Sequence, residues 1–251
     1  MCTVIIEVPD APTGSVRMLA VRDEHPERAW DPPGYWWPNE HPGVIGVRDR
    51  KAGGAWLAAD RDAVSVILNR AESVAELLQD GEPPLDSRGR IVLDSVEREP
   101  LEGRPHTESF NLVEIRDGVA TVTHWDGVAL AHNVLEPGVH MIAHGAIDDV
   151  SSARIGQWLP KYRSLAGLPA SRWRAEWIKT LELSAELDPD DDRAIIRDNT
   201  SHGYPTKSLL VCLVESGISG ASKDGVTLDS AVLTEAARWS GEKFIRHTLQ
   251  K

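Results

Sequence analysis

The sequence predicts an α+β domain in which antiparallel strands pack against helices. Over the first 150 residues, short segments rich in Val, Ile, Leu and Ala alternate with turn-forming residues, which is typical of consecutive antiparallel strands. Apolar residues then recur at helical spacing between residues 151 and 186, and another strand pattern begins at residue 206. Strands, then helices, then strands again favour one domain over residues 1–251 with sheet and helix layers.

The strand predictions in the first part of the chain rest on apolar runs bounded by turns. Pro9-Asp10, Pro32-Pro33-Gly34 and Gly53-Gly54 are among the turn formers that separate the runs. Asp117-Gly118 between two apolar runs is a strong signal for a β-hairpin. The predicted strands here are residues 2–8, 17–22, 44–48, 55–59, 63–69, 91–96, 110–116, 119–125 and 139–144.

Helices are predicted after residue 150. Ser151 or Ser152 can cap a helix that runs to about Leu165. A second helix is predicted over residues 172–186, where apolar side chains recur at helical spacing: Trp173, Trp177 and Leu181.

The end of the chain returns to strands. The acidic run 188–192 is typical of a solvated loop. Residues 206–215 then predict a strand, and residues 225–233 predict its hairpin partner.

Composition limits the classes of function. The net charge is −12, from 27 basic and 39 acidic side chains, which argues against nucleic acid or an anionic membrane as the main partner. Residues 1–8 lack the basic start and long apolar core of a secretory leader, and no apolar run approaches the length of a membrane span. We therefore expect a cytoplasmic protein with no integral membrane segment. No feature of the sequence indicates its oligomeric state.

Cys2 is the strongest candidate for a catalytic residue. The initiator methionine is usually removed when the next side chain is small, and Cys2 would then carry a thiol and a free α-amine on one residue. The α-amine, with a reference pKa of about 7.7–8, could serve as the base for the thiol. The alternative is that Cys2 is merely a small residue at the start of a strand. The only other cysteine, Cys212, lies in an apolar strand and is expected to be inert, and two cysteines make no disulfide framework.

Tryptophan is unusually frequent. The chain has nine Trp against three Tyr and two Phe, and four Trp lie near the N-terminus: Trp30, Trp36, Trp37 and Trp56. Trp suits the lining of a pocket for a flat or acyl ligand. The alternative is that Trp simply replaces Phe in the core.

Several short motifs, in order, resemble one known family. They are Met1-Cys2-Thr3, Ala20-Val21-Arg22-Asp23-Glu24, Trp36-Trp37, Gly46-Val47-Arg48-Asp49, Gly53-Gly54-Ala55-Trp56-Leu57, Leu68-Asn69-Arg70, Ser87-Arg88-Gly89, Phe110-Asn111-Leu112, Glu136-Pro137-Gly138-Val139-His140 and Thr206-Lys207-Ser208. Their succession over about residues 1–215 resembles the NRDE family, also called the transport and Golgi organisation protein 2 family. That family is similar to N-terminal-nucleophile hydrolases.

The resemblance implies a fold and a chemistry. The implied fold is a four-layer αββα sandwich of two antiparallel sheets between helix layers. The implied chemistry is an N-terminal cysteine hydrolase that cleaves an amide or thioester bond of a small acyl compound, with Cys2 as the nucleophile. Eukaryotic members are linked to Golgi organisation, lipid and acyl-CoA handling and haem trafficking, so the alternative is a non-catalytic protein that binds haem, an acyl-CoA or a lipid-like ligand.

The resemblance also implies roles for individual residues. Arg22 and Asp23 match the arginine and aspartate that flank the cysteine in acylases; the alternative is a strand-end salt bridge. Adjacent residues of a regular strand face opposite sides, so both can reach Cys2 only if the strand ends or bends there. Asn69 stands where an asparagine contributes to the oxyanion hole; the alternative is a turn residue that bonds its own backbone.

Four departures from the family pattern concern the predicted site. His144 replaces an asparagine, and Lys207 replaces an arginine and so loses the planar fork for an anion. Val21 and Ala55 also depart from the pattern. We predict Trp37, Trp56, His144 and Lys207 as substrate-binding residues.

No metal or cofactor is expected. On a strand, His140 and His144 would lie roughly 13 Å apart, too far to share one zinc ion. Haem remains open as a ligand, although no local signature marks an axial histidine.

Overall fold

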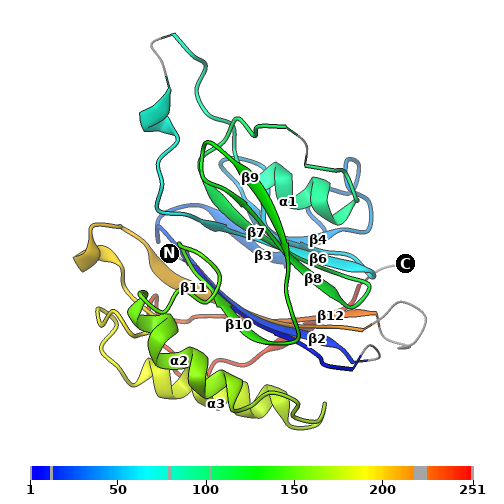
Figure 1. Ribbon diagram of the computed structural model, residues 1–251, viewed down its shortest axis with the longest axis vertical. Coiled ribbons are helices and arrows are strands. Elements are labelled where there is room, and N and C mark those ends of the chain that lie inside the picture. The colour runs from blue at the N-terminus through cyan, green and yellow to red at the C-terminus, as the bar shows by residue number, and fades with distance from the viewer. Residues whose placement is uncertain (1, 12–13, 79–80, 102, 218–224, 250–251) are drawn as a thin grey trace.

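Two antiparallel sheets lie face to face in the computed structural model, which describes residues 2–11, 14–78, 81–101, 103–217 and 225–249 (Figure 1). The first sheet has the order β10 (Gly138–Ile142), β1 (Thr3–Val8), β2 (Val16–Glu24), β11 (Lys207–Ser216), β12 (Val226–Val232) and β13 (Ile245–His247). The second sheet has the order β3 (Trp30–Gly34), β4 (Ile45–Asp49), β5 (Ala55–Ala59), β6 (Ala63–Asn69), β7 (Phe110–Arg116), β8 (Val119–Trp125) and β9 (Leu130–Val134).

Strands β1 and β2 are apolar on both faces because each face meets a different layer. Val4 and Ile6 belong to the core between the two sheets, whereas Ile5 belongs to the core between the first sheet and the helices. Successive side chains of a strand point to opposite faces, so an apolar run is expected where both faces are covered.

Helices cover the outer faces of both sheets. α2 (Ala153–Arg163) and α3 (Trp173–Ala185) pack on the first sheet, where Trp177 makes edge contacts with Trp173 and Tyr162. α1 (Gly89–Val96) packs on β5 and β6 of the second sheet. Figure 1 shows the resulting order of helix, sheet, sheet and helix layers. The predicted α+β fold of two antiparallel sheets is confirmed, and α1 is the only α-helix in the described part of the second outer layer.

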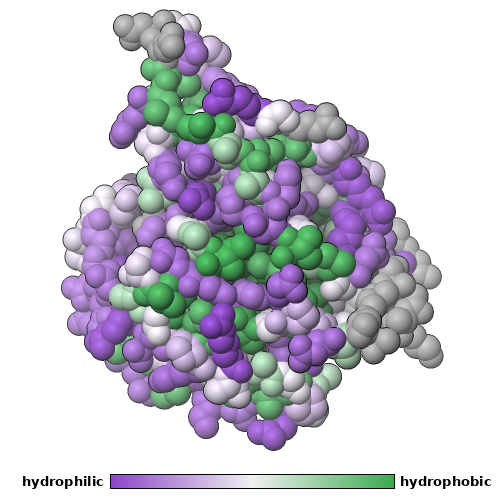
Figure 2. All heavy atoms as spheres, in the orientation of Figure 1, coloured by the Kyte–Doolittle hydropathy of each residue, from purple (hydrophilic) through white to green (hydrophobic). Residues whose placement is uncertain are grey.

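The remaining short elements lie outside the four layers. A one-turn helix, η1 (Ala75–Leu77), belongs to an arm between β6 and α1 that projects from the sandwich (Figure 1), and a second, η2 (Thr200–His202), precedes β11. Hydrophobic residues are visible on this arm in Figure 2, and Leu77 is among the exposed ones. In the described residues, no helix is long and apolar enough to cross a membrane.

The structure corrects the prediction for residues 91–96. They belong to helix α1 and not to a strand. Val96 follows the buried residues Val92 and Leu93 by four and three positions, which is helical spacing. Arg90 and Asp94 also form an i,i+4 ion pair on this helix. The periodicity of a short apolar run fits either a strand or a helix, and in this chain packing on β5 and β6 favours the helix.

Three strands were not predicted. β3 contains Pro32 and Pro33, which were predicted as a turn. Proline is tolerated there because β3 is an edge strand whose pairing with β4 is irregular between Asp31 and Gly34. β9 is largely exposed, and β13 has only three residues, so neither has a strong apolar pattern.

The other predicted elements are confirmed within one to three residues at each end. The Asp117-Gly118 hairpin joins β7 and β8, and both residues have positive φ, as a two-residue type I′ turn requires. β12 pairs with β11 in an antiparallel hairpin, as predicted.

Candidate active site around Cys2

Strands β1 and β2 bring Cys2 against Asp23. Thr3 pairs with Val21, so the residue before β1 lies beside the end of β2. The Asp23 backbone N–H donates to Cys2 Sγ at 3.4 Å, and the Cys2 thiol lies 3.6 Å from the Asp23 carbonyl oxygen. Cys2 is 8% exposed. The thiol is therefore placed by backbone groups of the neighbouring strand.

The Asp23 carboxylate is oriented by residues from the far end of the chain. Ser208 donates its hydroxyl to Oδ1 at 2.6 Å, and the Asn199 amide donates to Oδ2 at 3.1 Å. The pairing of β2 with β11 shifts register between Ser208 and Leu210, next to Asp23. The shift lies between the partners of Arg22 and Asp23, where the strand would have to end or bend for both side chains to reach Cys2.

Arg22 lies on the other side of the strand from the Asp23 carboxylate. Its side chain is 3% exposed, donates to Glu24 at 3.2 Å and stacks over Trp30 at 5.3 Å. Among the described residues, its Nε and Nη1 have no hydrogen-bond partner. Burial raises the pKa of the Cys2 thiol, and the Asp23 carboxylate raises it further. The positive charge of Arg22 has a smaller effect in the opposite direction.

Cys2 opens into a small polar cavity, here called the Cys2 pocket, with a volume of about 250 Å³. Asn69, exposed at the end of β6, lines the pocket together with Asp23. The structure thus brings three of the predicted catalytic residues into one cavity, with Arg22 beside them. The lining also includes Arg70, Arg88 and Ser109 and the carboxylates of Glu24, Glu72 and Glu108.

The predicted substrate-binding residues do not gather in this pocket. Trp37 lines a separate, larger cavity beside α1, and its indole N–H donates to the Gly53 carbonyl at 2.7 Å. Trp56 is buried in the apolar cluster that joins both sheets and α1. Lys207 pairs with Asp198 at 2.7 Å, and its side chain does not line the Cys2 pocket.

His144 lies near the site without lining it. It follows β10, and its carbonyl accepts the Ala71 backbone N–H at 3.2 Å, so it borders a segment that lines the pocket. Burial lowers the pKa of His144, and the positive charge of Arg154 lowers it further. His144 is therefore neutral near pH 7. The described part of the chain contains no group of His, Cys, Asp and Glu that could hold a metal ion.

Two arginines that the sequence interpretation did not assign also line the Cys2 pocket. Arg70 is bound to Glu72, to the Asn111 side chain at 3.0 Å and to the Gly145 carbonyl at 3.2 Å. Arg88 donates to the Ser109 carbonyl at 2.8 Å. Both belong to motifs that carried the family resemblance, Leu68-Asn69-Arg70 and Ser87-Arg88-Gly89, and those motifs were the available signal.

A buried cation with no sequence signal contacts Thr3, the residue after Cys2. Arg154 of α2 is 2% exposed and donates to the Thr3 hydroxyl at 2.5 Å. Burial lowers the pKa of Arg154 to about 10, and the charge of nearby Arg197 adds to the effect. Because a strand residue and a helix residue meet only in the folded chain, spacing alone could not reveal this contact.

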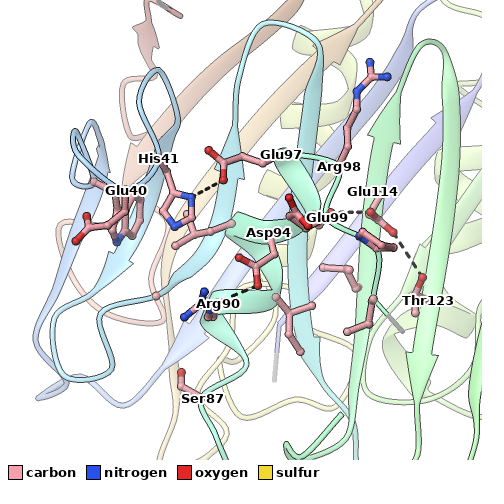
Figure 3. Close-up of a pocket in the computed structure, with 18 of the residues that line it drawn as sticks. Glu40, His41, Ser87, Arg90, Asp94, Glu97, Arg98, Glu99, Glu114 and Thr123 are labelled. Carbon is pink, nitrogen blue, oxygen red and sulfur yellow. Dashed lines mark hydrogen bonds and ion pairs between the residues drawn. The ribbon is translucent and has the colours of Figure 1, made fainter. Parts of the chain in front are cut away.

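A second cavity, of about 1140 Å³, lies on the outer face of the second sheet beside α1 (Figure 3). His41 pairs with Glu97 at 2.7 Å on one side of α1, and Glu114 accepts the Ser95 hydroxyl at 2.6 Å on the other. Arg90 and Asp94 of α1 also line it and pair with each other. It is larger than the Cys2 pocket but does not include Cys2, Asp23 or Asn69.

Comparisons with known proteins support the family resemblance. The family model described as Transport and Golgi organisation 2 matches residues 1–188, which is 188 of the 251 residues. A comparison with curated proteins found no match. The matched segment supplies Cys2, Asp23, Asn69, Arg70 and Arg88. This chain belongs to the Transport and Golgi organisation 2 family.

Proposed function

We propose that this protein is an N-terminal cysteine hydrolase that cleaves an amide or thioester bond of a small acyl compound. One observation carries the proposal: the Cys2 thiol borders a polar pocket while backbone groups of Asp23 hold its sulfur. Cys212, by contrast, is fully buried in β11, as expected for a cysteine that only fills the core.

Activation of the thiol needs a base within the site. Burial raises the pKa of the Cys2 thiol, so the thiolate is scarce at pH 7 unless a nearby group takes the proton. Removal of Met1, which lies outside the described residues, would free the α-amine of Cys2 for this role. The Arg22 charge and the Asp23 backbone N–H would stabilise the thiolate that forms.

The reaction then follows two steps. The Cys2 thiolate attacks the carbonyl carbon, the C–N or C–S bond breaks, and the protonated α-amine passes its proton to the leaving amine or thiolate. Water next hydrolyses the Cys2 thioester, which releases the acid and restores the thiol. The Asn69 amide and a backbone N–H would bind the oxyanion, and one such donor is worth about 3–4 kcal/mol in the transition state.

Replacement of Cys2 tests the mechanism. We expect Cys2→Ala and Cys2→Ser to abolish turnover of small amides or thioesters and to leave circular dichroism and the melting temperature nearly unchanged, since Ala and Ser are close to Cys in size and the sulfur contacts only backbone groups of Asp23 through its hydrogen bonds. Cys212→Ala is the matched control, because it removes the other thiol without touching the pocket and should retain turnover. Unchanged turnover in Cys2→Ala would exclude Cys2 as the nucleophile.

Intact mass spectrometry tests whether Met1 is removed and whether the Cys2 thiol is reactive. We expect the purified protein to lack Met1 and to take up one alkyl group rapidly under native conditions, at Cys2. Retained Met1 would contradict an N-terminal nucleophile. Wild-type protein that turns over no substrate, but binds haem or an acyl-CoA saturably and equally well after Cys2→Ala, would instead favour the non-catalytic binding role.

A further inference from the structure

The charges that line the Cys2 pocket are almost all engaged. The Asp23 carboxylate accepts hydrogen bonds from Ser208 and Asn199. Glu24 accepts from Arg22, and Glu72 is bound by Arg70. Glu108 accepts the Val74 backbone N–H at 2.7 Å. None of these carboxylates pairs with Arg88.

Arg88 is the exception. Its one hydrogen bond goes from Nη1 to the neutral Ser109 carbonyl, and among the described residues no carboxylate lies within ion-pairing distance. A guanidinium has five N–H donors and no acceptor, so most of its donors remain for a ligand. Arg88 is half-buried and faces the same cavity as Cys2. Burial lowers the pKa of Arg88, and the charge of Glu108, which lines the same pocket, partly offsets this effect, so the guanidinium keeps its charge near neutral pH.

The backbone that carries Arg88 is fixed by a close contact between two motifs. Gly89 begins α1 and lies directly against Gly54, so a Cβ built on Gly54 would be 2.5 Å from the Gly89 carbonyl carbon. A Cβ built on Gly89 would be 2.9 Å from Gly54 Cα. The backbones of the two segments therefore pack directly on each other. This contact fixes the backbone next to Arg88, and the hydrogen bond to the Ser109 carbonyl orients its side chain.

From these observations we infer that Arg88 recognises a carboxylate on the substrate, and that the substrates of the Cys2 site are small anionic amides or thioesters. The inference rests on the function proposed above. The planar guanidinium can bind a carboxylate through two parallel hydrogen bonds, which gives orientation as well as affinity. The pocket volume of about 250 Å³ is below the usual range for drug-sized ligands, so the part of the ligand that it holds is small.

The other two arginines near the nucleophile are less suited to this role. Arg70 already binds Glu72, Asn111 and Gly145. Arg22 pairs with Glu24, is almost fully buried and does not line the pocket. Arg88 is thus the cation that a substrate carboxylate can reach without breaking an existing ion pair.

A binding experiment on the Cys2→Ala protein tests the inference without turnover. The probes are N-acetylglycine, which carries a carboxylate, and N-acetylglycinamide, a neutral amide of nearly the same size, with affinity measured by calorimetry or NMR titration. We expect the carboxylate probe to bind roughly 10- to 100-fold more tightly, as for a charge-assisted hydrogen-bonded pair. In the Cys2→Ala protein, Arg88→Gln should remove the preference for the carboxylate probe, and Arg88→Lys should keep part of it.

The control variant is Arg90→Gln, which makes the same charge change two residues away. Arg90 is exposed, pairs with Asp94 and lines the other cavity, so the preference should survive. Equal affinity for the two probes, no binding of the carboxylate probe, or a carboxylate preference that persists in full in Arg88→Gln would overturn the inference.

Turnover assays separate this inference from the proposed function. Wild-type protein that hydrolyses neutral and anionic amides equally well would overturn the role of Arg88 and leave the hydrolase intact. A carboxylate preference that depends on Arg88, together with no turnover of any amide or thioester by the wild type, would support carboxylate binding and count against the hydrolase.

Discussion

Single buried side chains in this protein join segments that lie far apart in the sequence. Asn111 is an example: its amide donates to the carbonyls of Ala143 at 3.1 Å and Gly145 at 2.9 Å, and its oxygen accepts from Arg70. It is 1% exposed and links β7 of the second sheet to the segment after β10 of the first. The polar side chain is buried because every one of these hydrogen bonds is made.

His140 gives a pH-dependent contribution to stability. Its Nδ1 lies 2.8 Å from the Asp148 carboxylate, and this hydrogen bond raises the pKa of His140. Burial alone would raise the pKa of Asp148, but the hydrogen bond from His140 lowers it. The Glu136 carbonyl and Arg163 also face the pair.

The two shifts define the window in which the pair stabilises the fold. A raised histidine pKa adds stability that is complete below the unfolded value of about 6.5 and is lost as the pH rises through the folded pKa. A lowered Asp148 pKa adds stability that is lost as the pH falls through that pKa. We expect His140→Gln to lower the melting temperature more at about pH 5.5 than at about pH 9. An equal effect at both pH values would contradict the pairing.

At the scale of elements, the position of α1 depends on two glycines. Gly54 and Gly89 touch through their backbones, so an added methyl group at either has no free space. We expect Gly54→Ala and Gly89→Ala each to destabilise the protein by about 1–3 kcal/mol, as overpacking does, in chemical denaturation.

A double-mutant cycle checks that the two glycines share one contact. Once α1 has moved away to admit the first methyl group, the second should cost less, so the double variant should be more stable than the sum of the single costs predicts. Strictly additive costs would mean that the two sites are independent. Because Arg88 precedes Gly89, both variants should also weaken binding of N-acetylglycine.

At the scale of the whole molecule, residues beyond the family match complete the structure. The match ends at residue 188, yet β11 lies between β2 and β12 in the middle of the first sheet. Asn199 and Ser208, which orient Asp23, also come from this later part of the chain. The C-terminal region therefore belongs to the same sandwich and to the same site.

The shared core leads to a prediction about unfolding. One apolar cluster joins both sheets and α1, and a second joins the first sheet to α2 and α3. Since β1 and β2 contribute to both clusters, we expect residues 1–251 to unfold as one domain in a single transition. Far-UV circular dichroism and hydrogen exchange of peptides from β7 and α3 should give one midpoint. Separate midpoints for β7 and α3 would indicate two units and contradict the single-domain prediction.

The sequence by itself determined the α+β class, the family and most strands and helices, because these depend on local patterns. An apolar run on β1, a turn at Asp117-Gly118 and helical spacing around Trp177 are each visible within a few residues. Residues 91–96 are the exception, because a short apolar run fits both a strand and a helix, and packing on the second sheet makes this segment helix α1.

Only the tertiary structure decided which motifs meet. Cys2, Asn69 and Arg88 lie far apart in sequence and share one pocket, whereas Trp37 and Trp56 lie elsewhere. Strand pairing and layer packing set these contacts, and neither is encoded in spacing along the chain. For the same reason, the sequence could name Arg22 and Asp23 but could not show that the Asp23 backbone, more than its side chain, holds the sulfur.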